Sequence, residues 1–281
     1  MELSHFDYFA TPLIFAVFVA LTWLQWKHPV RRQYLKALPR IITNLVFALP
    51  AFLALRLALI PIPLAAAAWA ENNHVGLLHW LSLPLVINCI IGLLLLDYAY
   101  YWWHVAAHRV PLLWRFHNVH HTDLDMDVST ATRFHFCELL LSVAFRVVTV
   151  VLMGLPPWLL LVFEVVFECA GQFHHSNWRL HPAIERVLNL VFVTPRMHGI
   201  HHSIVLRETN SNWGTIFSWW DKLHRTLRMD IPQDAITIGV PAYRDEKELT
   251  VGQLWLMPFR PIRPWQLPDG EKPERDPSQT D

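Results

Sequence analysis

Seventeen histidines lie in this 281-residue chain, and eight of them form three closely spaced groups. The groups are His104 and His108; His117, His120 and His121; and His198, His201 and His202. Residues three and four apart share one face of an α-helix, so each group presents its imidazoles in one direction. Imidazole is a ligand for zinc, copper, iron and nickel. The spacing therefore indicates a metal centre built from three helix faces.

The number of histidines predicts a dinuclear site. Eight imidazoles are too many for one metal ion, whereas two ions can take four or five each and keep room for oxygen or a bridging species. Ordinary packing is disfavoured, because unpartnered imidazoles at a membrane boundary cost free energy. The isolated histidines are interpreted as packing or surface residues: His5, His28, His74, His79 and His224.

The elements that position these histidines must be apolar. The chain is 53% hydrophobic and 16% charged, well below the roughly 25% charge of soluble domains. Residues 8–26 carry no charge and are long enough, at about 1.5 Å per residue, to cross a hydrocarbon core of about 30 Å. We interpret them as a retained anchor, since acidic Glu2 and Asp7 precede them.

Further apolar runs cover 41–60, 83–103 and 139–173. The run 83–103 leads directly into His104, and Gly154, Pro156 and Pro157 break the last run in its middle. That break predicts a helical hairpin with both ends on one face. Its arms could cross the membrane twice or form a re-entrant hairpin, because Arg146 lies in the first arm.

The distribution of positive charge predicts the topology. The basic segment 27–40 is expected to be cytoplasmic, whereas 1–10, 61–83 and the hairpin tip, with no Lys or Arg, are expected on the far side. The histidines would then face the cytoplasm, in a bacterial inner membrane or an endoplasmic reticulum equivalent. The predicted fold is an all-α integral membrane protein with about four transmembrane helices and a cytoplasmic, helical, histidine-rich cap.

Three regions follow from this organisation: membrane-anchor helices over 1–80, a catalytic domain over 81–228 and a cytoplasmic tail over 229–281. Residues 254–259 could lie on the membrane surface, and the last dozen residues are expected to be disordered.

Several function classes lack support. The 23 basic and 23 acidic residues balance, so no charge excess indicates nucleic acid. Cys89, Cys137 and Cys169 lie in apolar runs, which suits neither a disulfide framework nor a zinc ribbon. No His-Glu-x-x-His motif, glycine-rich phosphate loop or Ser-His-Asp order is present.

The histidine order and its surroundings resemble the fatty acid hydroxylase and sterol desaturase superfamily. The resemblance covers roughly 85–227 and rests on 97–104 (Asp-Tyr-Ala-Tyr-Tyr-Trp-Trp-His), 111–117 (Pro-Leu-Leu-Trp-Arg-Phe-His), 129–135 (Ser-Thr-Ala-Thr-Arg-Phe-His), 173–177 (Phe-His-His-Ser-Asn), 194–198 (Thr-Pro-Arg-Met-His), 212–214 (Asn-Trp-Gly) and 220–221 (Trp-Asp). The chain departs from the family pattern at Phe136, where relatives often carry proline, and at 223–225. These departures bear on the substrate pocket rather than on the proposed ligands.

The resemblance implies a membrane di-iron oxidoreductase that uses O2 to hydroxylate or desaturate a C–H bond of a lipid. Electrons would come from a separate b-type cytochrome or ferredoxin-type donor. The eight clustered histidines would be ligands and His175 the ninth, with His135 and His174 left open. Fatty acyl chains, sterols, carotenoids and alkyl ethers remain alternatives for the substrate.

Acidic residues are expected to accept the second N–H of each imidazole. The candidates are Asp97, Asp123, Asp125, Glu138, Glu168 and Asp221, with Asp123 the preferred one. Salt bridges to the neighbouring arginines are the alternative role for each of them.

Two other functions remain as alternatives. A zinc or other metal transporter predicts ligands near the bilayer midplane with acidic residues along the spans. A zinc-dependent lipid hydrolase predicts an open zinc site with a carboxylate base beside it. The many clustered imidazoles favour the oxidoreductase over both.

Overall fold

The computed structural model describes residues 3–33, 35–81 and 83–275, and these segments are helical, with isolated β-bridges but no β-strand. The elements are α1 (Leu3–Lys27), α2 (Ala37–Phe47), α3 (Leu49–Ala54), the π-helical turn η1 (Leu55–Leu59), α4 (Pro61–Asn72), α5 (Leu77–Leu81), α6 (Leu85–Arg109), α7 (Pro111–His121), η2 (Val128–Thr132), α8 (Phe136–Met153), α9 (Pro157–His175), α10 (Pro182–Leu188), α11 (Pro195–His201), α12 (Leu206–Thr209), α13 (Trp219–His224), η3 (Gln233–Ala235), η4 (Glu246–Glu248), α14 (Val251–Leu256) and η5 (Met257–Phe259).

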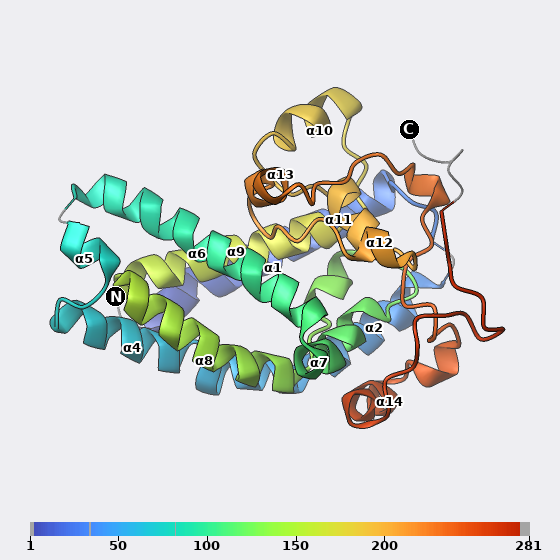
Figure 1. The fold of residues 1–281 in the computed structure, drawn as a ribbon, viewed down its shortest axis with the longest axis horizontal. Coiled ribbons are helices and arrows are strands. Elements are labelled where there is room, and N and C mark those ends of the chain that lie inside the picture. Colours follow the sequence, from blue (N-terminus) through green and yellow to red (C-terminus); the bar gives the residue numbers. More distant parts are fainter. Residues whose placement is uncertain (1–2, 34, 82, 276–281) are drawn as a thin grey trace.

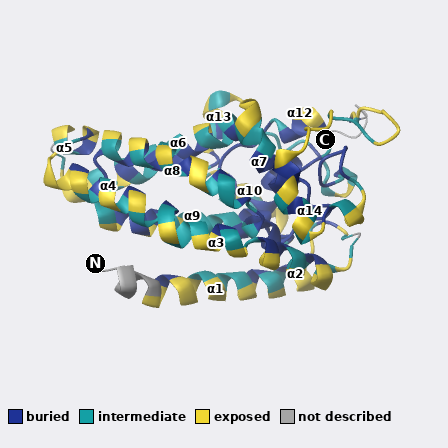
Figure 2. Cartoon of the chain, turned by 90° about the horizontal axis from the view of Figure 1, so that it is seen from below, coloured by how far each residue is buried: buried dark blue, intermediate teal, exposed yellow. Residues whose placement is uncertain are grey.

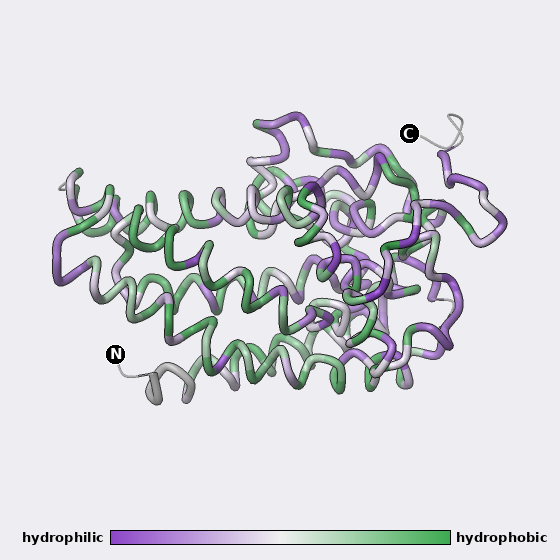
Figure 3. Tube along the Cα trace, turned by 60° about the horizontal axis from the view of Figure 1, so that its bottom comes forward, coloured by the Kyte–Doolittle hydropathy of each residue, from purple (hydrophilic) through white to green (hydrophobic). Residues whose placement is uncertain are grey.

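The long helices lie side by side, and α7, α11 and α12 gather at one end of the molecule (Figure 1). Four helical segments of the described chain are long and apolar enough to span a membrane: Tyr8–Lys27, Ala37–Leu81, Leu85–Arg109 and Phe136–Met153. Figure 3 shows hydrophobic residues along the long helices. Hydrophilic residues gather at the end of the molecule that lies near the C-terminus. The predicted all-α, multi-pass membrane architecture with about four spans is therefore confirmed.

The second apolar segment extends further than expected. Instead of ending near residue 60, the helical path continues through the π-helical turn Leu55–Leu59 into α4 and ends at Asn72. Pro61 and Pro63 do not stop it, because they lie in the first turn of α4, where backbone N–H groups lack intrahelical partners anyway. The predicted far-side segment 61–83 is thus helical over most of its length.

The hairpin consists of two complete helices. Arms α8 and α9 contain 18 and 19 residues, which corresponds to about 27 Å each. Gly154 ends α8 in the left-handed conformation, with φ of 70°, and Pro157 begins α9. Arg146 of α8 forms an ion pair with Glu164 of α9, so this arginine is accommodated inside the hairpin.

A glycine contact closes the end of the molecule that is remote from the histidines. Gly76, at φ of 110°, precedes α5 and lies directly against the backbone of Gly154. The start of α1, the α4–α5 connection and the hairpin tip consequently share one end (Figure 1). This grouping is the one that the positive-inside rule predicted.

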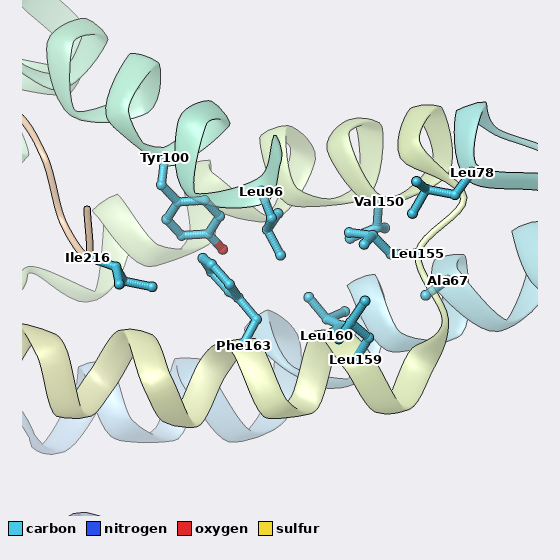
Figure 4. Packing of buried hydrophobic residues seen from close by; sticks show 10 residues of the cluster. All are labelled: Ala67, Leu78, Leu96, Tyr100, Val150, Leu155, Leu159, Leu160, Phe163 and Ile216. Atoms are coloured by element: carbon cyan, nitrogen blue, oxygen red, sulfur yellow. The ribbon is translucent and has the colours of Figure 1, made fainter. Parts of the chain in front are cut away.

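The interior between the long helices is apolar. Leu96 and Tyr100 of α6 pack with Val150 of α8 and with Leu159 and Phe163 of α9 (Figure 4). Large apolar side chains also point outward, including Val86 at 69% and Leu152 at 67% exposure. An apolar exterior around an apolar core is the pattern expected of helices that face lipid.

The histidine end is more deeply buried than the long helices (Figure 2), and the C-terminal segment contributes to its packing. Ile231 and Ile238 pack with Ile200 of α11, while Leu254 of α14 joins Phe47 of α2. Of the predicted apolar patch 254–259, Leu254 and Met257 are buried, whereas Leu256 and Phe259 are more than half exposed.

The end of the described chain is anchored rather than disordered. The Arg275 guanidinium donates from Nε and Nη2 to the two carboxylate oxygens of Glu208, each at 2.9 Å. Both side chains are buried. Arg275, one of the last dozen residues, is thus held in place, whereas residues 276–281 lie outside the described part and their expected disorder stays a prediction.

Candidate metal centre

Helix α7, helix α11 and the last turn of α9 meet at the end of α6. The helix α6 carries His104 and His108 in its last two turns, and α7 follows after Val110 because Pro111 starts a new helix. The helix α11 starts at Pro195, where the Thr194 hydroxyl accepts a hydrogen bond from Met197 N–H. Helix α9 ends at His175 and packs against α11.

The nine candidate ligands gather in two groups. Within each group the potential ligand atoms lie within 4.8 Å of one another. The first group consists of His104, His108, His117, His121 and His201, and the second group of His120, His175, His198 and His202. Each group combines histidines from several helices. Even His120 and His121, which are neighbours on α7, belong to different groups.

The separations between nitrogens in the second group suit a shared metal ion. His175 Nε2 lies 3.0 Å from His120 Nε2 and 3.0 Å from His198 Nε2, and His198 Nε2 lies 3.1 Å from His202 Nε2. Metal–imidazole bonds of about 2.0–2.1 Å place the ligand nitrogens of a tetrahedral ion roughly 3.3 Å apart. The second group therefore has the dimensions of a mononuclear histidine site.

The first group is rich in buried nitrogens that lack a hydrogen-bond partner among the described residues. They include Nε2 of His108, His117, His121 and His201. Buried polar atoms are almost always satisfied, so each exception needs an explanation. Bound metal supplies one, because an unprotonated imidazole nitrogen is a ligand atom.

Burial keeps the cap histidines neutral. It lowers the pKa of His120, His121, His198, His201 and His202 well below 6.5, and neighbouring histidines lower these values further. His121, His201 and His202 are fully buried. Neutral imidazole is the form that binds metals, so the environment suits the proposed chemistry.

Several imidazoles of the two groups form a hydrogen bond through Nδ1. In most of them the acceptor is a backbone carbonyl, which orients the ring. The Nδ1–H groups of His104, His175 and His201 donate to the carbonyl oxygens of Trp213, Gly171 and Ser211 at 2.9, 2.7 and 2.8 Å. Such contacts fix the tautomer and leave Nε2 free to bind a metal. Sequence reasoning missed these partners, because every residue carries a carbonyl.

Glu138 is a predicted acid that does contact a clustered imidazole. His117 Nδ1–H donates to Glu138 Oε1 at 2.8 Å, and both side chains are about 95% buried. A carboxylate in this position increases the basicity of the imidazole. The predicted role is confirmed for Glu138.

Asp123, the preferred candidate, has a different role. Its carboxylate accepts hydrogen bonds from Arg40 Nη1 at 2.8 Å, Asn44 Nδ2 at 2.9 Å and Thr130 Oγ1 at 2.8 Å. Burial alone would raise its pKa, but Arg40 and Arg133 outweigh this effect, and the pKa is lowered. Asp123 therefore joins α2 to the segment after α7, and the expectation that it orients an imidazole is wrong.

Asp97 and Asp221 support a backbone segment that contacts the histidines. Asp221 accepts hydrogen bonds from the backbone N–H groups of Trp213 and Gly214, and Asp97 accepts from those of Ile216 and Phe217. The two acids hold the segment whose Trp213 carbonyl contacts His104. The other two candidates bond elsewhere: Glu168 accepts from Gln172, and Asp125 accepts from Leu35 N–H.

The four remaining histidines of this region lie outside both groups, and one of them, His181, caps the start of α10 by accepting from Ala183 N–H. His135 caps the start of α8 by accepting from Cys137 N–H. His174 packs against His198 with ring centroids 4.1 Å apart. His224 stacks between Tyr98 and Tyr101. The cysteines Cys89, Cys137 and Cys169 are free.

Comparison with known proteins identifies relatives for the histidine-bearing part. Residues 89–226 match the family model of the fatty acid hydroxylases. The chain is 31% identical over 183 residues to the ornithine lipid hydroxylase OlsE of Rhizobium tropici, a match that covers 63% of this chain and 54% of that protein. It is 30% identical to human cholesterol 25-hydroxylase, over 60% of this chain and 62% of the relative.

More distant similarity extends to human alkylglycerol monooxygenase, at 27% identity over 57% of this chain and 34% of that protein. The chain thus matches between about a third and three fifths of the length of these curated relatives. No solved structure gives a significant match.

Proposed function

Because this chain belongs to the fatty acid hydroxylase family through residues 89–226, we propose that it is a membrane-bound di-iron oxidoreductase. In this proposal it uses O2 and external electrons to oxidise a C–H bond of a lipid. Residues 81–228 form the catalytic domain and 1–80 the membrane anchor. The nine histidines of the two groups bind the metals.

The observation that carries the proposal is the pair of histidine groups at the end of apolar helices. Five and four imidazoles converge within 4.8 Å in each group, and imidazole suits iron as well as zinc and copper. Iron, when bound, supplies the redox chemistry that activates O2. The protein holds the imidazoles, fixes their tautomers and excludes water from the surroundings.

Aromatic side chains contribute to the exclusion of water. Trp213, 1% exposed, packs against His104, His108 and His201 with ring centroids 4.6 to 5.5 Å apart. Trp114 covers His108 from another side at 4.9 Å. A dry site protects a reactive oxidant from unproductive reactions.

The relatives favour hydroxylation over desaturation, because those compared are named as hydroxylases or monooxygenases. Their named substrates are an ornithine lipid, cholesterol and alkylglycerols, so a lipid with a C–H bond within reach of the metals is the proposed substrate class. A separate b-type cytochrome or ferredoxin-type protein delivers the electrons.

We place the metal centre on the cytoplasmic side. The basic segment 27–40 connects α1 to α2 at the histidine end, whereas the opposite end contains the Lys- and Arg-free connection 73–84. The location at the ends of the helices disfavours a metal transporter, which predicts ligands near the bilayer midplane. The contact between Glu138 and His117 disfavours a hydrolase, since this carboxylate is engaged in orienting a ligand.

The test is metal analysis combined with oxygen uptake. The protein is purified in detergent, its metal content is measured, and oxygen consumption is followed with a reductant and a lipid extract. Two irons per chain and lipid-dependent oxygen uptake support the proposal. His120→Ala should abolish uptake and lower metal content, while the exposed His28→Ala should change neither. Zinc without oxygen consumption, from protein prepared with iron supplied, would overturn the proposal.

A further inference from the structure

Helix α9 turns an unusual set of residues toward the inside of the molecule. At 3.6 residues per turn, four of its residues fall within about 60° of one another. They are Glu164, Glu168, Gly171 and His175. Trp158, Val162 and Val166 lie on the opposite side of the helix and are 40 to 44% exposed. The outward side is thus apolar, and the inward side combines carboxylates, a glycine and a candidate ligand.

Open space lies beside Gly171. A Cβ atom built on this residue would have no neighbour within 4 Å among the described residues. The surroundings of Gly92 of α6 are different, since a Cβ on that residue would lie 2.9 Å from Leu155. Close packing is the rule inside proteins. We infer that the room at Gly171, which is partly accessible and one turn from His175, is a passage next to the second histidine group.

Polar groups beside the passage are incompletely satisfied. Glu164 is neutralised by Arg146 and also accepts from Tyr100 Oη at 3.4 Å. Glu168 has no ion-pair partner among the described residues, and its carboxylate accepts only a 3.4 Å bond from Gln172 Nε2. Gln172 is 2% exposed, and its Oε1 lacks a partner within the described part of the chain. Glu168 Oε and Gln172 Oε1 are therefore available to a ligand that donates hydrogen bonds.

The geometry points to a substrate channel along the inward side of α9, in which the lipid passes over Gly171 and its hydroxyl, amide or ammonium group donates to Glu168. The substrate class is then a lipid with such a donor, not a plain hydrocarbon. Glu168 precedes His175 by seven residues, or about 10 Å along the helix. The carbon to be oxidised is then expected about 10 Å from the donor group, measured along the helix. This inference deepens the proposed function and rests on it for the reaction.

Binding can be tested without turnover, which separates this inference from the proposed activity. The full-length protein in lipid nanodiscs is exposed to two photoreactive probes, 1-octadecanol and octadecane that carry the same mid-chain diazirine. After irradiation, the labelled residues are mapped by mass spectrometry. We expect the alcohol to label the inward side of α9 and its neighbours, and the alkane to label mainly the outward side at Val162 and Val166.

Gly171→Val fills the passage without a predicted clash and should reduce inward labelling by the alcohol about tenfold. Gly252→Val is the matched control, because Gly252 of α14 also has open space around it. This variant should leave labelling unchanged.

Glu168→Met removes the acceptor and should lower alcohol labelling about tenfold, to the level of the alkane, whereas Glu168→Gln should retain most of it. Metal content and thermal unfolding verify that each variant folds.

Inward labelling that persists in Gly171→Val, or equal inward labelling by both probes in the wild type, overturns the channel. Loss of labelling in Gly171→Val with metal content intact supports it, even where the protein consumes no oxygen. Oxygen uptake by a wild-type protein that shows no inward labelling overturns the channel and leaves the proposed oxidoreductase standing.

Discussion

Glu138 Oε1 lies 2.8 Å from Nδ1 of His117, and this contact joins the first turn of α8 to the ligand-bearing face of α7. The membrane hairpin and the proposed metal centre are therefore coupled through one buried carboxylate. The contact leaves Nε2 of His117 directed at the first histidine group.

Removal of this carboxylate should weaken metal binding. Glu138→Ala deprives His117 of its acceptor, and we expect the affinity of the first group for metal to fall about 10- to 100-fold. Competition with a chelator measures the change. Glu138→Gln should lie between wild type and Glu138→Ala, because the amide oxygen still accepts the Nδ1–H. The exposed Glu248→Gln serves as control; equal affinities in all four proteins would show that the contact is incidental.

Each histidine group should bind its own ion. His121→Ala removes a ligand of the first group and His202→Ala one of the second, so each variant should retain about one of two metals. Elemental analysis by mass spectrometry gives the count, with His28→Ala as the matched exposed histidine. A His202→Ala protein that keeps both ions would exclude the second group as a metal site.

The buried ion pairs beside the site should matter for stability. Arg40 bonds the carboxylates of Asp123 and Asp127, and its side chain is 6% exposed. Arg40→Met leaves both carboxylates without this cation, which should lower the free energy of unfolding by about 3–5 kcal/mol. The exposed Arg263→Met, which breaks the pair with Glu248, should cost at most about 1 kcal/mol. Thermal unfolding in detergent compares the two, and similar losses would contradict the buried network.

The glycine contact at the remote end should tolerate no side chain. A Cβ on Gly76 would collide with the backbone of Gly154, and both residues have positive φ. Gly76→Ala should therefore destabilise the protein by at least about 1–2 kcal/mol, while Gly252→Ala on α14 should be neutral. Unfolding temperatures provide the comparison. Oxygen uptake by folded Gly76→Ala should match the wild type, since the contact lies at the opposite end from the histidines.

The cytoplasmic placement predicts which positions can be labelled from outside. In a background where Cys89, Cys137 and Cys169 are replaced by serine, Asn73→Cys should react with a membrane-impermeant maleimide on intact cells. Asp234→Cys, equally exposed but at the histidine end, should react only after lysis. The reverse pattern would invert the topology.

Much of the architecture follows from local patterns in the chain. Uninterrupted apolar runs predicted α1 and α6, and Gly154 with Pro156 predicted the turn of the hairpin. The i, i+3 and i+4 spacing placed His117, His120 and His121 on one helix. These features depend on neighbours in sequence, which is why they could be predicted.

Other features depend on partners far along the chain. The carbonyls of Ser211 and Trp213 orient His201 and His104, but no residue type distinguishes them. Asp123 lies two residues after His121 in sequence, yet its partners are Arg40 and Asn44 from α2. The division of adjacent His120 and His121 between two groups likewise depends on which helix faces each side chain.

The segment after α13 has a consequence for biosynthesis. Ile231 and Ile238 pack against Ile200, Trp265 Nε1–H donates to the Ile204 carbonyl, and Arg275 pairs with Glu208. Ile231, Ile238, Trp265 and Arg275 all leave the ribosome after the last of the nine histidines. The cap around the histidines can therefore close only after all nine of them have been synthesised. Folding of the cap is thus completed late, when the newly made C-terminal segment packs against α11 and α12.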